Sequence, residues 1–353
     1  MTRSVPTDTP SRASATGVMR DGGSRKSAAL KARRFQRGIA PSKSIPSTSK
    51  ARSVGLAAEA SVDDAIAVVF EACRTHWHVN VVAAVDGRDA EGIHQVRVAL
   101  RRMRSALGAF KKFIPAVQRL WLKDEAKWLL TQLGPVRDLD VFIHGLVTPV
   151  ANGVSDDPGL AQLMRAARIA QRQAQTEASK TLQSVRVARF MTRLETWIKG
   201  RGWRAGARKH VRDARTITAA DFGSQFLNRR LRNIMDDTGD IAGLTVEERH
   251  ELRIAVKKTR YNVEFFQAVL PAKRANRLNG VLKDLQDNLG HLNDIDVAER
   301  TIATLTKGSA NETERRQVAA GGAAVSDWHK DAAKKAEPDL AKLWRKLKKV
   351  SAL

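Results

Sequence analysis

The sequence contains an internal duplication, which constrains the fold more than any other feature. Residues 94–104 read HQVRVALRRMR, and residues 250–260, which begin 156 positions later, read HELRIAVKKTR. The same offset aligns further residues without a gap: Phe110 with Phe266, Pro115 with Pro271, Lys127 with Lys283, Gly134 with Gly290, Asp138 with Asp294, and Asp140 with Asp296. Because such a register is hard to obtain by chance, the two halves are expected to share one arrangement of structural elements.

The apolar pattern predicts that these elements are helices. From about residue 58 onward, apolar side chains recur every three or four positions, and strand-like alternation is almost absent. Thr245 and Glu248 have the spacing of a capping box, which predicts a helix start. We therefore expect an all-α domain over residues 58–350, built as two helical bundles that face each other across a pseudo-twofold axis. The repeat halves are expected at about 58–215 and 216–350.

Residues 1–55 are expected to form a disordered, basic N-terminal tail. This segment is rich in Ser, Thr, Gly and Pro, and Asp8 and Asp21 are its only acidic residues. Such a composition offers too little apolar surface to fold alone. Two roles stay open, a solvated linker and an auxiliary arm that raises the affinity for a polyanion. The Ser- and Arg-rich composition also resembles organellar transit peptides, but no clear amphipathic helix supports that interpretation.

Charge and cysteine usage indicate the compartment and the class of partner. The single cysteine, Cys73, cannot form an internal disulfide, which favours a reducing compartment. No stretch reaches the roughly 18 unbroken apolar residues of a spanning helix, and no apolar signal core is present, so a cytoplasmic protein without a membrane span is expected. The formal net charge of +25 points to a polyanion: nucleic acid, polyphosphate or an anionic membrane surface.

Each copy of the repeat presents basic side chains along one face of its helix. On a helical wheel, Val96, Leu100, Met103, Leu107 and Phe110 lie opposite this face in the first copy. The basic positions are His94, Arg97, Arg101, Arg104, Lys111 and Lys112 in the first copy, and His250, Arg253, Lys257 and Arg260 in the second. Neighbours on such a face are about 5–6 Å apart, a spacing at which Arg and Lys can contact successive phosphates. A solvated basic face is the alternative, but the near absence of acids in the row and its recurrence favour a polyanion site.

The paired histidines and aspartates allow several interpretations. His94 and His250 begin the two basic rows, and phosphate contact and a structural role are both open, because no partners with metal-ligand spacing are evident nearby. The Asp138/Asp140 and Asp294/Asp296 pairs favour helix capping or pairing with Arg, although a metal site or acid/base chemistry is also conceivable. No metal or other cofactor is expected.

Signatures of catalysis are missing from the sequence. It contains no phosphate-binding Gly-x-x-x-x-Gly-Lys-Ser/Thr loop, no Gly-x-Ser-x-Gly elbow and no Cys-x-x-Cys pair. We therefore expect a binding protein and not an enzyme. The main alternative is a nucleic-acid-binding, nucleoid-associated protein, although an aromatic content of 5% argues against a base-stacking surface. A phosphohydrolase that uses the Asp pairs is a third hypothesis.

Together, the two runs at 94–104 and 250–260, GPVRDLD at 134–140 and GHLNDID at 290–296 resemble the CHAD family, the conserved-histidine α-helical domain, over about residues 58–350. The resemblance implies two pseudo-twofold-related bundles, inorganic polyphosphate as the ligand, and recruitment to polyphosphate granules. Carried over position by position, it places polyphosphate contacts on His94, Arg97, Arg101, Arg102, Arg104, Lys111, Lys112, Lys127, His250, Arg253, Lys257, Lys258, Arg260 and Lys283.

Two departures from the first copy weaken the second copy of the surface. Thr259 stands where the first copy has Met103, and Glu264 interrupts the basic row where the first copy has Gly108. The second surface is therefore expected to bind less strongly. Many relatives also carry a CYTH-type triphosphatase domain, but its Glu-x-Glu-x-Lys motif is absent here, so the resemblance does not imply enzymatic activity.

Overall fold

A computed structural model describes residues 44–154, 156–206, 209–239 and 241–351 of the chain. Within these ranges the secondary structure is helical, and the single β pairing is an isolated bridge between Ser61 and Thr218. The expectation of an all-α fold is therefore confirmed. Residues 1–43, most of the predicted tail, lie outside the described ranges.

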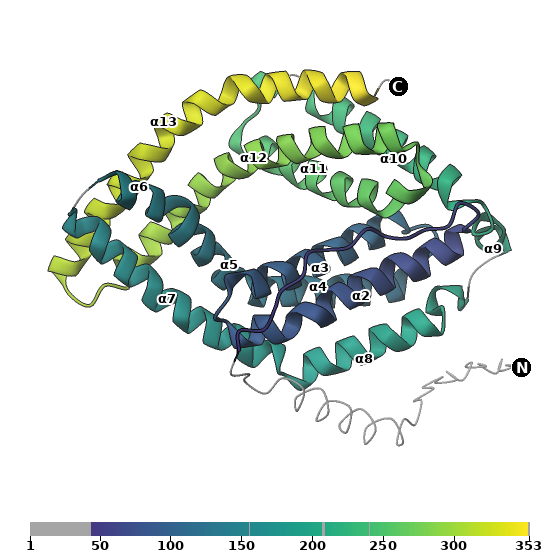
Figure 1. Ribbon diagram of the computed structural model, residues 1–353, viewed down its shortest axis with the longest axis horizontal. Helices are drawn as coiled ribbons and strands as arrows, with labels where there is room; N and C mark the ends of the chain where they lie inside the picture. Colours follow the sequence, from purple (N-terminus) through teal and green to yellow (C-terminus); the bar gives the residue numbers. More distant parts are fainter. Residues whose placement is uncertain (1–43, 155, 207–208, 240, 352–353) are drawn as a thin grey trace, which may run out of the picture.

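The helices follow one another along the chain in two series. The first series is α2 (Val62–Asp86), α3 (Ala90–Ala109), α4 (Ala116–Gln132), α5 (Gly134–Val141), a π-helical turn η1 (Phe142–Val147), α6 (Thr148–Gly153), α7 (Pro158–Leu182) and α8 (Val185–Lys199). The second is η2 (Gly202–Arg204), α9 (Lys209–Ala214), α10 (Ala219–Thr238), η3 (Ile241–Gly243), α11 (Val246–Phe266), η4 (Gln267–Val269), α12 (Ala272–Lys307) and α13 (Glu312–Ser351). Figure 1 shows α2, α3, α4 and α8 grouped on one side, and α10, α11, α12 and the end of α13 on the other.

Helix starts repeat at the offset of the sequence duplication. Helices α3 and α11 begin 156 residues apart, at Ala90 and Val246, and α4 and α12 do so at Ala116 and Ala272. The capping box at the start of α11 is present as predicted, with Thr245 accepting from the Glu248 backbone N–H.

The copies differ where the first series breaks between α4 and α5. Pro135 follows Gly134 at this break, whereas His291 follows Gly290 inside the continuous helix α12. A proline has no N–H for the helical ladder and its ring clashes with the preceding turn, so it starts a new helix. This one substitution explains why one half has two helices where the other has one.

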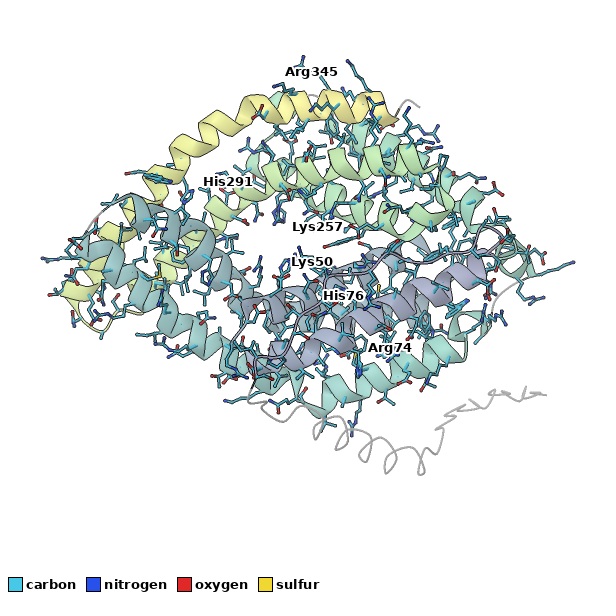
Figure 2. All side chains as sticks on the ribbon, viewed as in Figure 1. Lys50, Arg74, His76, Lys257, His291 and Arg345 are labelled. Atoms are coloured by element: carbon cyan, nitrogen blue, oxygen red, sulfur yellow. The ribbon has the colours of Figure 1, made fainter. Side chains whose placement is uncertain are left out.

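Apolar faces of both series meet in a large shared core. Phe110 of α3 lies 5.7 Å from Phe222 of α10 and 6.0 Å from Phe266 of α11, measured between ring centroids. A buried polar contact also joins α2 to α3, where Nε2 of His76 (labelled in Figure 2) lies 2.8 Å from the Gln95 Oε1 atom. A smaller apolar cluster joins η1 and α7 to α12 and α13.

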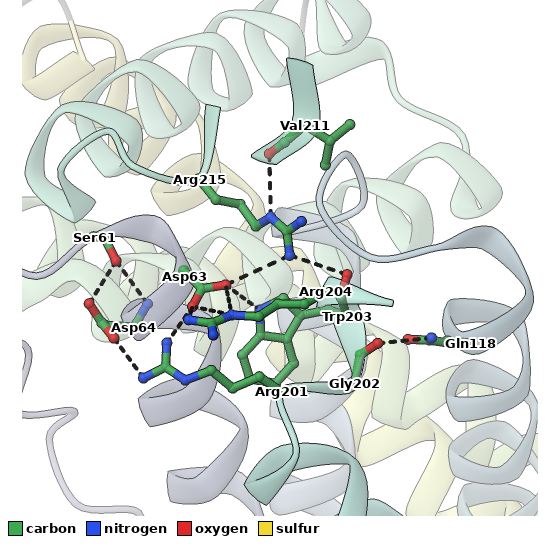
Figure 3. Close-up of polar contacts among 10 residues, drawn as sticks. All are labelled: Ser61, Asp63, Asp64, Gln118, Arg201, Gly202, Trp203, Arg204, Val211 and Arg215. Carbon is green, nitrogen blue, oxygen red and sulfur yellow. Dashed lines mark hydrogen bonds and ion pairs between the residues drawn. The ribbon is translucent and has the colours of Figure 1, made fainter. Parts of the chain in front are cut away.

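An ion-pair cluster fixes the start of α2 to the loop before α10. Figure 3 shows Asp63 receiving hydrogen bonds from Arg201, Arg204 and the Trp203 indole N–H. Burial raises the pKa of Asp63, but the bonds from Arg204, Trp203 and Arg201 outweigh it and lower that pKa to about 2. These contacts hold the start of α2 against η2, the short helix that follows α8 in the chain.

An extended segment, residues 44–60, precedes α2. Its first twelve residues fall in the range predicted to be disordered, yet Val54 within that range is buried in the main core, as is Leu56 just after it. The Ser49 N–H donates to Asn80 Oδ1 of α2 at 2.8 Å, and Asn80 Nδ2 donates back to the Ser49 carbonyl at 2.9 Å. The predicted boundary at residue 55 is therefore placed too late, because Val54 is buried in the core and Ser49 bonds to Asn80, contacts that the polar composition of the segment does not show.

Candidate functional site

The basic rows of α3 and α11 approach one another between the two helix groups. These helices are in direct contact, and Figure 2 shows Lys257 on the side of α11 that is turned toward α3. The cations whose charges shift one another's pKa values here come from three helices. Besides α3 and α11, α5 contributes Arg137, which the helical wheel did not include. We define the central cluster as His94, Arg97 and Arg101 of α3, Arg137 of α5, and Arg253 and Lys257 of α11, with Asp138 and Asp294 among them.

Burial and mutual repulsion lower the pKa values of basic side chains in the central cluster. Burial, followed by the charges of Arg101 and Arg253, lowers the pKa of Lys257 to about 6, although Asp294 opposes this shift. Burial, followed by the charge of Arg137, lowers the pKa of His94 to about 4. Burial also lowers the pKa of Arg253, whose Nε atom is buried without a hydrogen-bond partner among the described residues. A site that disfavours its own positive charge gains free energy when an anion enters.

The two members of each aspartate pair occupy different surroundings: Asp138 and Asp294 lie in the central cluster, and Asp140 and Asp296 lie outside it. Burial raises the pKa of Asp138, against the charges of Arg97 and Arg101, and the nearby Asp294 raises it further. Asp140 is instead buried against α7, where its Oδ1 accepts from Gln171 Nε2 at 3.1 Å, and Asp296 is exposed. Among the described residues, no group of three His, Cys, Asp or Glu side chains could hold a metal ion.

Two of the predicted contact residues are buried and already bonded within the protein. Arg97, 6% exposed, donates from Nη1 to the Leu130 carbonyl in the last turn of α4 at 2.7 Å. Arg102, 3% exposed, donates from Nη1 to Glu264 Oε2 of α11 at 2.6 Å. Their guanidinium groups therefore stabilise the packing of α3 against α4 and α11. The helical wheel could not distinguish this role from an exposed one at Arg97, and Arg102 was predicted only from the family resemblance.

Four other predicted residues line a separate pocket. Arg104 and Lys258 face it from α3 and α11, and Lys111 and Lys112 follow the end of α3. The pocket has a volume of about 480 Å³ and is also lined by four cations that the sequence reasoning missed: Arg119, Lys123, Arg229 and Arg230. Arg119 and Lys123 lie on α4, at repeat positions where the second copy has Ala275 and Asn279, and the two arginines lie on α10, outside the repeated segment.

The remaining predicted residues lie outside both groups. His250 is exposed and its Nδ1 lies 2.8 Å from Asn293 Oδ1. Lys283 forms an exposed ion pair with Asp287 at 3.0 Å, and Lys127 is exposed on α4. Arg260 contacts Glu264 at 2.9 Å and Gln286 at 3.0 Å.

Comparison with known proteins identifies the fold. The family model described as the CHAD domain matches residues 68–303, about two thirds of the chain. This protein belongs to the CHAD domain family. Its structure is similar to the crystal structure of the CHAD domain from the plant Ricinus communis, with a TM-score of 0.70 and 26% sequence identity over 85% of this chain and 96% of that one.

A second solved structure shares the fold at lower identity. It is PptA from Streptomyces chartreusis, with a TM-score of 0.57 and 14% identity over 81% of this chain and 100% of that one. A search of curated proteins finds no match. Within the described part of the CHAD chain, no helix combines the length and apolar character that a membrane crossing requires.

Proposed function

We propose that this CHAD protein binds inorganic polyphosphate at the central cluster. The observation that carries the proposal is the convergence of the two basic rows: Arg101 of α3 and Arg253 of α11 both depress the pKa of Lys257. Cations of both halves are therefore close enough to act on one anionic chain. A linear polyphosphate supplies a negative charge every few ångströms and can neutralise them together, while Arg can donate two hydrogen bonds to one phosphate.

The arrangement of the two halves supports the same proposal. The Ala60 carbonyl accepts from the Ala219 N–H at 2.7 Å, and the Ile217 carbonyl accepts from the Val62 N–H at 3.0 Å. These two bonds flank the antiparallel bridge between Ser61 and Thr218, which joins the start of α2 to the start of α10. We propose that a pseudo-twofold axis relates the two halves, which would bring equivalent basic helices to opposite sides of one ligand.

Aromatic side chains favour polyphosphate over single-stranded nucleic acid. Trp77, Trp203, Phe70 and Phe110 are fully buried, and among the described aromatic side chains Trp328 is the one more than a third exposed, so the described domain offers no row of exposed rings for stacking successive bases. Duplex DNA, contacted through phosphates alone, is the competing ligand that an experiment must exclude.

Competition binding tests the proposal. Long-chain polyphosphate and duplex DNA of equal total charge compete for the full chain at two salt concentrations, and we expect polyphosphate to bind more tightly at both. The double variant R101Q/R253Q should weaken polyphosphate binding at least tenfold, whereas the control variant K127Q/K283Q, which removes two exposed cations away from the cluster, should change it less than threefold. Stronger binding of DNA, or equal affinities for the two double variants, would overturn the proposal.

The activity and location follow as parts of the proposal. We expect no release of phosphate from polyphosphate in the presence of Mg²⁺ or Mn²⁺, and turnover that Asp138→Ala or Asp294→Ala abolishes would contradict this expectation. We also propose recruitment to polyphosphate granules in the cytoplasm. A fluorescent fusion of the wild-type chain should colocalise with granules, and the R101Q/R253Q fusion should not.

A further inference from the structure

The two copies of the repeat differ at one position that lies between two cations. In the second copy, Glu264 accepts from Arg102 at 2.6 Å and pairs with Arg260 at 2.9 Å. At the repeat offset, the equivalents of Glu264, Arg102 and Arg260 are Gly108, Lys258 and Arg104. An internal carboxylate thus bridges the two cations in one half, and a glycine leaves the corresponding cations without it in the other.

The glycine opens the pocket at this place. Gly108 is exposed, and a side chain added there would meet no atom within 4 Å. Gly108, Arg104 and Lys258 all line the 480 Å³ pocket between α3, α4, α10 and α11. This volume lies within the range of about 300–1,000 Å³ that is typical of small-molecule sites.

The charges of the pocket are unbalanced. Its lining contains eight Lys and Arg residues and no Asp or Glu, and none of the eight forms an ion pair within the described part of the chain. The Nε atom of Arg119 and the Oδ1 atom of Asn262, both on lining residues, are buried without partners among the described residues. Burial, followed by the charges of Arg230 and Arg104, lowers the pKa of Lys258. The aromatic side chains of Phe222 and Phe226 also line the pocket.

We propose that this pocket is a second anion site, separate from the central cluster, that takes a compact polyphosphoryl group with one phosphoryl unit between Arg104 and Lys258. Glu264 marks where the anionic oxygen lies, because it performs the same bridging at the equivalent place of the other half. The group is supplied by a free oligophosphate or by the end of a longer chain. The proposal does not require the central cluster to bind polyphosphate.

The reciprocal substitution tests the site. Gly108→Glu introduces the carboxylate of the second half without removing a cation, and we expect it to weaken the binding of tripolyphosphate to the full chain at least tenfold in titration calorimetry. Gly280→Glu is the matched control, since Gly280 is also an exposed helical glycine whose added side chain would meet no atom within 4 Å. It adds the same charge on α12 and should change the affinity less than twofold.

Further variants separate the pocket from the central cluster. R101Q/R253Q should leave the affinity for tripolyphosphate within threefold of wild type. The effect of the same variant on the affinity for long-chain polyphosphate tests the proposed function. Either proposal can therefore fail while the other stands. The double variant R119Q/R229Q removes two positive charges from the pocket and tests the proposal independently if G108E folds poorly. It should also weaken the binding of tripolyphosphate at least tenfold.

The pocket proposal is wrong if folded G108E binds tripolyphosphate as tightly as G280E, if R119Q/R229Q binds it like wild type, or if R101Q/R253Q alone abolishes its binding. A long chain that binds G108E and wild type equally well would show that the pocket serves free oligophosphates and not chain ends.

Discussion

At the scale of single residues, the lowered pKa of Lys257 predicts that the proposed anion binding is coupled to protonation. Its pKa of about 6 leaves it mostly neutral at pH 8, because burial and the charges of Arg101 and Arg253 disfavour the ammonium form. A bound polyphosphate reverses that balance and raises the pKa, so binding at pH 8 should take up a proton, and affinity should rise as pH falls from 8 toward 6. Calorimetry in two buffers of different ionisation enthalpy measures the uptake. Lys257→Gln should remove it and Lys127→Gln should keep it; an uptake that persists in K257Q would contradict the prediction.

Asp63 determines how stability responds to acid. Its folded pKa of about 2 lies below the unfolded value of about 3.9, so its contribution is present above pH 4 and is lost as pH falls toward 2. Asp63→Asn leaves Arg201, Arg204 and Arg215 without a buried anion, and we expect it to lower the free energy of unfolding by about 3 kcal/mol at pH 7.

Urea unfolding of D63N at pH 7 and pH 2 measures this contribution. The difference from wild type should shrink at pH 2, where Asp63 is about half protonated in the folded protein and almost fully protonated in the unfolded chain. The control Glu177→Gln, which breaks an exposed pair with Lys180, should cost less than about 1 kcal/mol. Equal losses for D63N and E177Q would show that the cluster at the start of α2 does not stabilise the fold.

At the scale of helices, Glu264 determines how α3 packs against α11. Arg102 is 3% exposed, so Glu264→Gln would leave a buried guanidinium without its anionic partner. We expect E264Q to lower the free energy of unfolding by about 3 kcal/mol in phosphate-free buffer. Urea unfolding measures the loss, and the exposed control E177Q should again cost less than about 1 kcal/mol. A loss in E264Q no larger than that of the control would mean that the pair does not stabilise the contact.

The helices could be predicted from the sequence more completely than the site. Periodicity and the capping box at Thr245 identified the elements, because these signals are local. The wheel placed Arg97 on a polar face, but it could not show that the end of α4 covers that side chain and supplies the Leu130 carbonyl. Arg229 and Arg230 could not be predicted as pocket residues, because the packing of α10 brings them to the pocket and no local sequence pattern encodes that packing. Gly108 and Glu264 were visible as a departure between copies, yet only tertiary contacts show what each does.

At the scale of the whole molecule, the net charge of +25 is distributed between the folded domain and the tail. Residues 1–43 carry ten Lys and Arg and two Asp, a minority of the basic residues. The central cluster and the pocket both lie within the described domain, where the cations are held in place before a ligand arrives. Because preorganised groups lose less entropy on binding than a tail whose composition predicts disorder, most of the affinity is expected to reside in the domain.

Two truncations separate the contributions of the tail to binding and to folding. Removing residues 1–43 should leave the free energy of unfolding unchanged and weaken polyphosphate binding less than R101Q/R253Q does. Removing residues 1–58 also deletes Val54 and Leu56 from the core and the Ser49 partner of Asn80. Burial of each apolar side chain contributes about 1.5–3 kcal/mol, so this truncation should lower the free energy of unfolding by about 3–6 kcal/mol in urea titration. If the shorter deletion abolished binding while the fold stayed intact, the basic tail, and not the folded domain, would be the polyphosphate site.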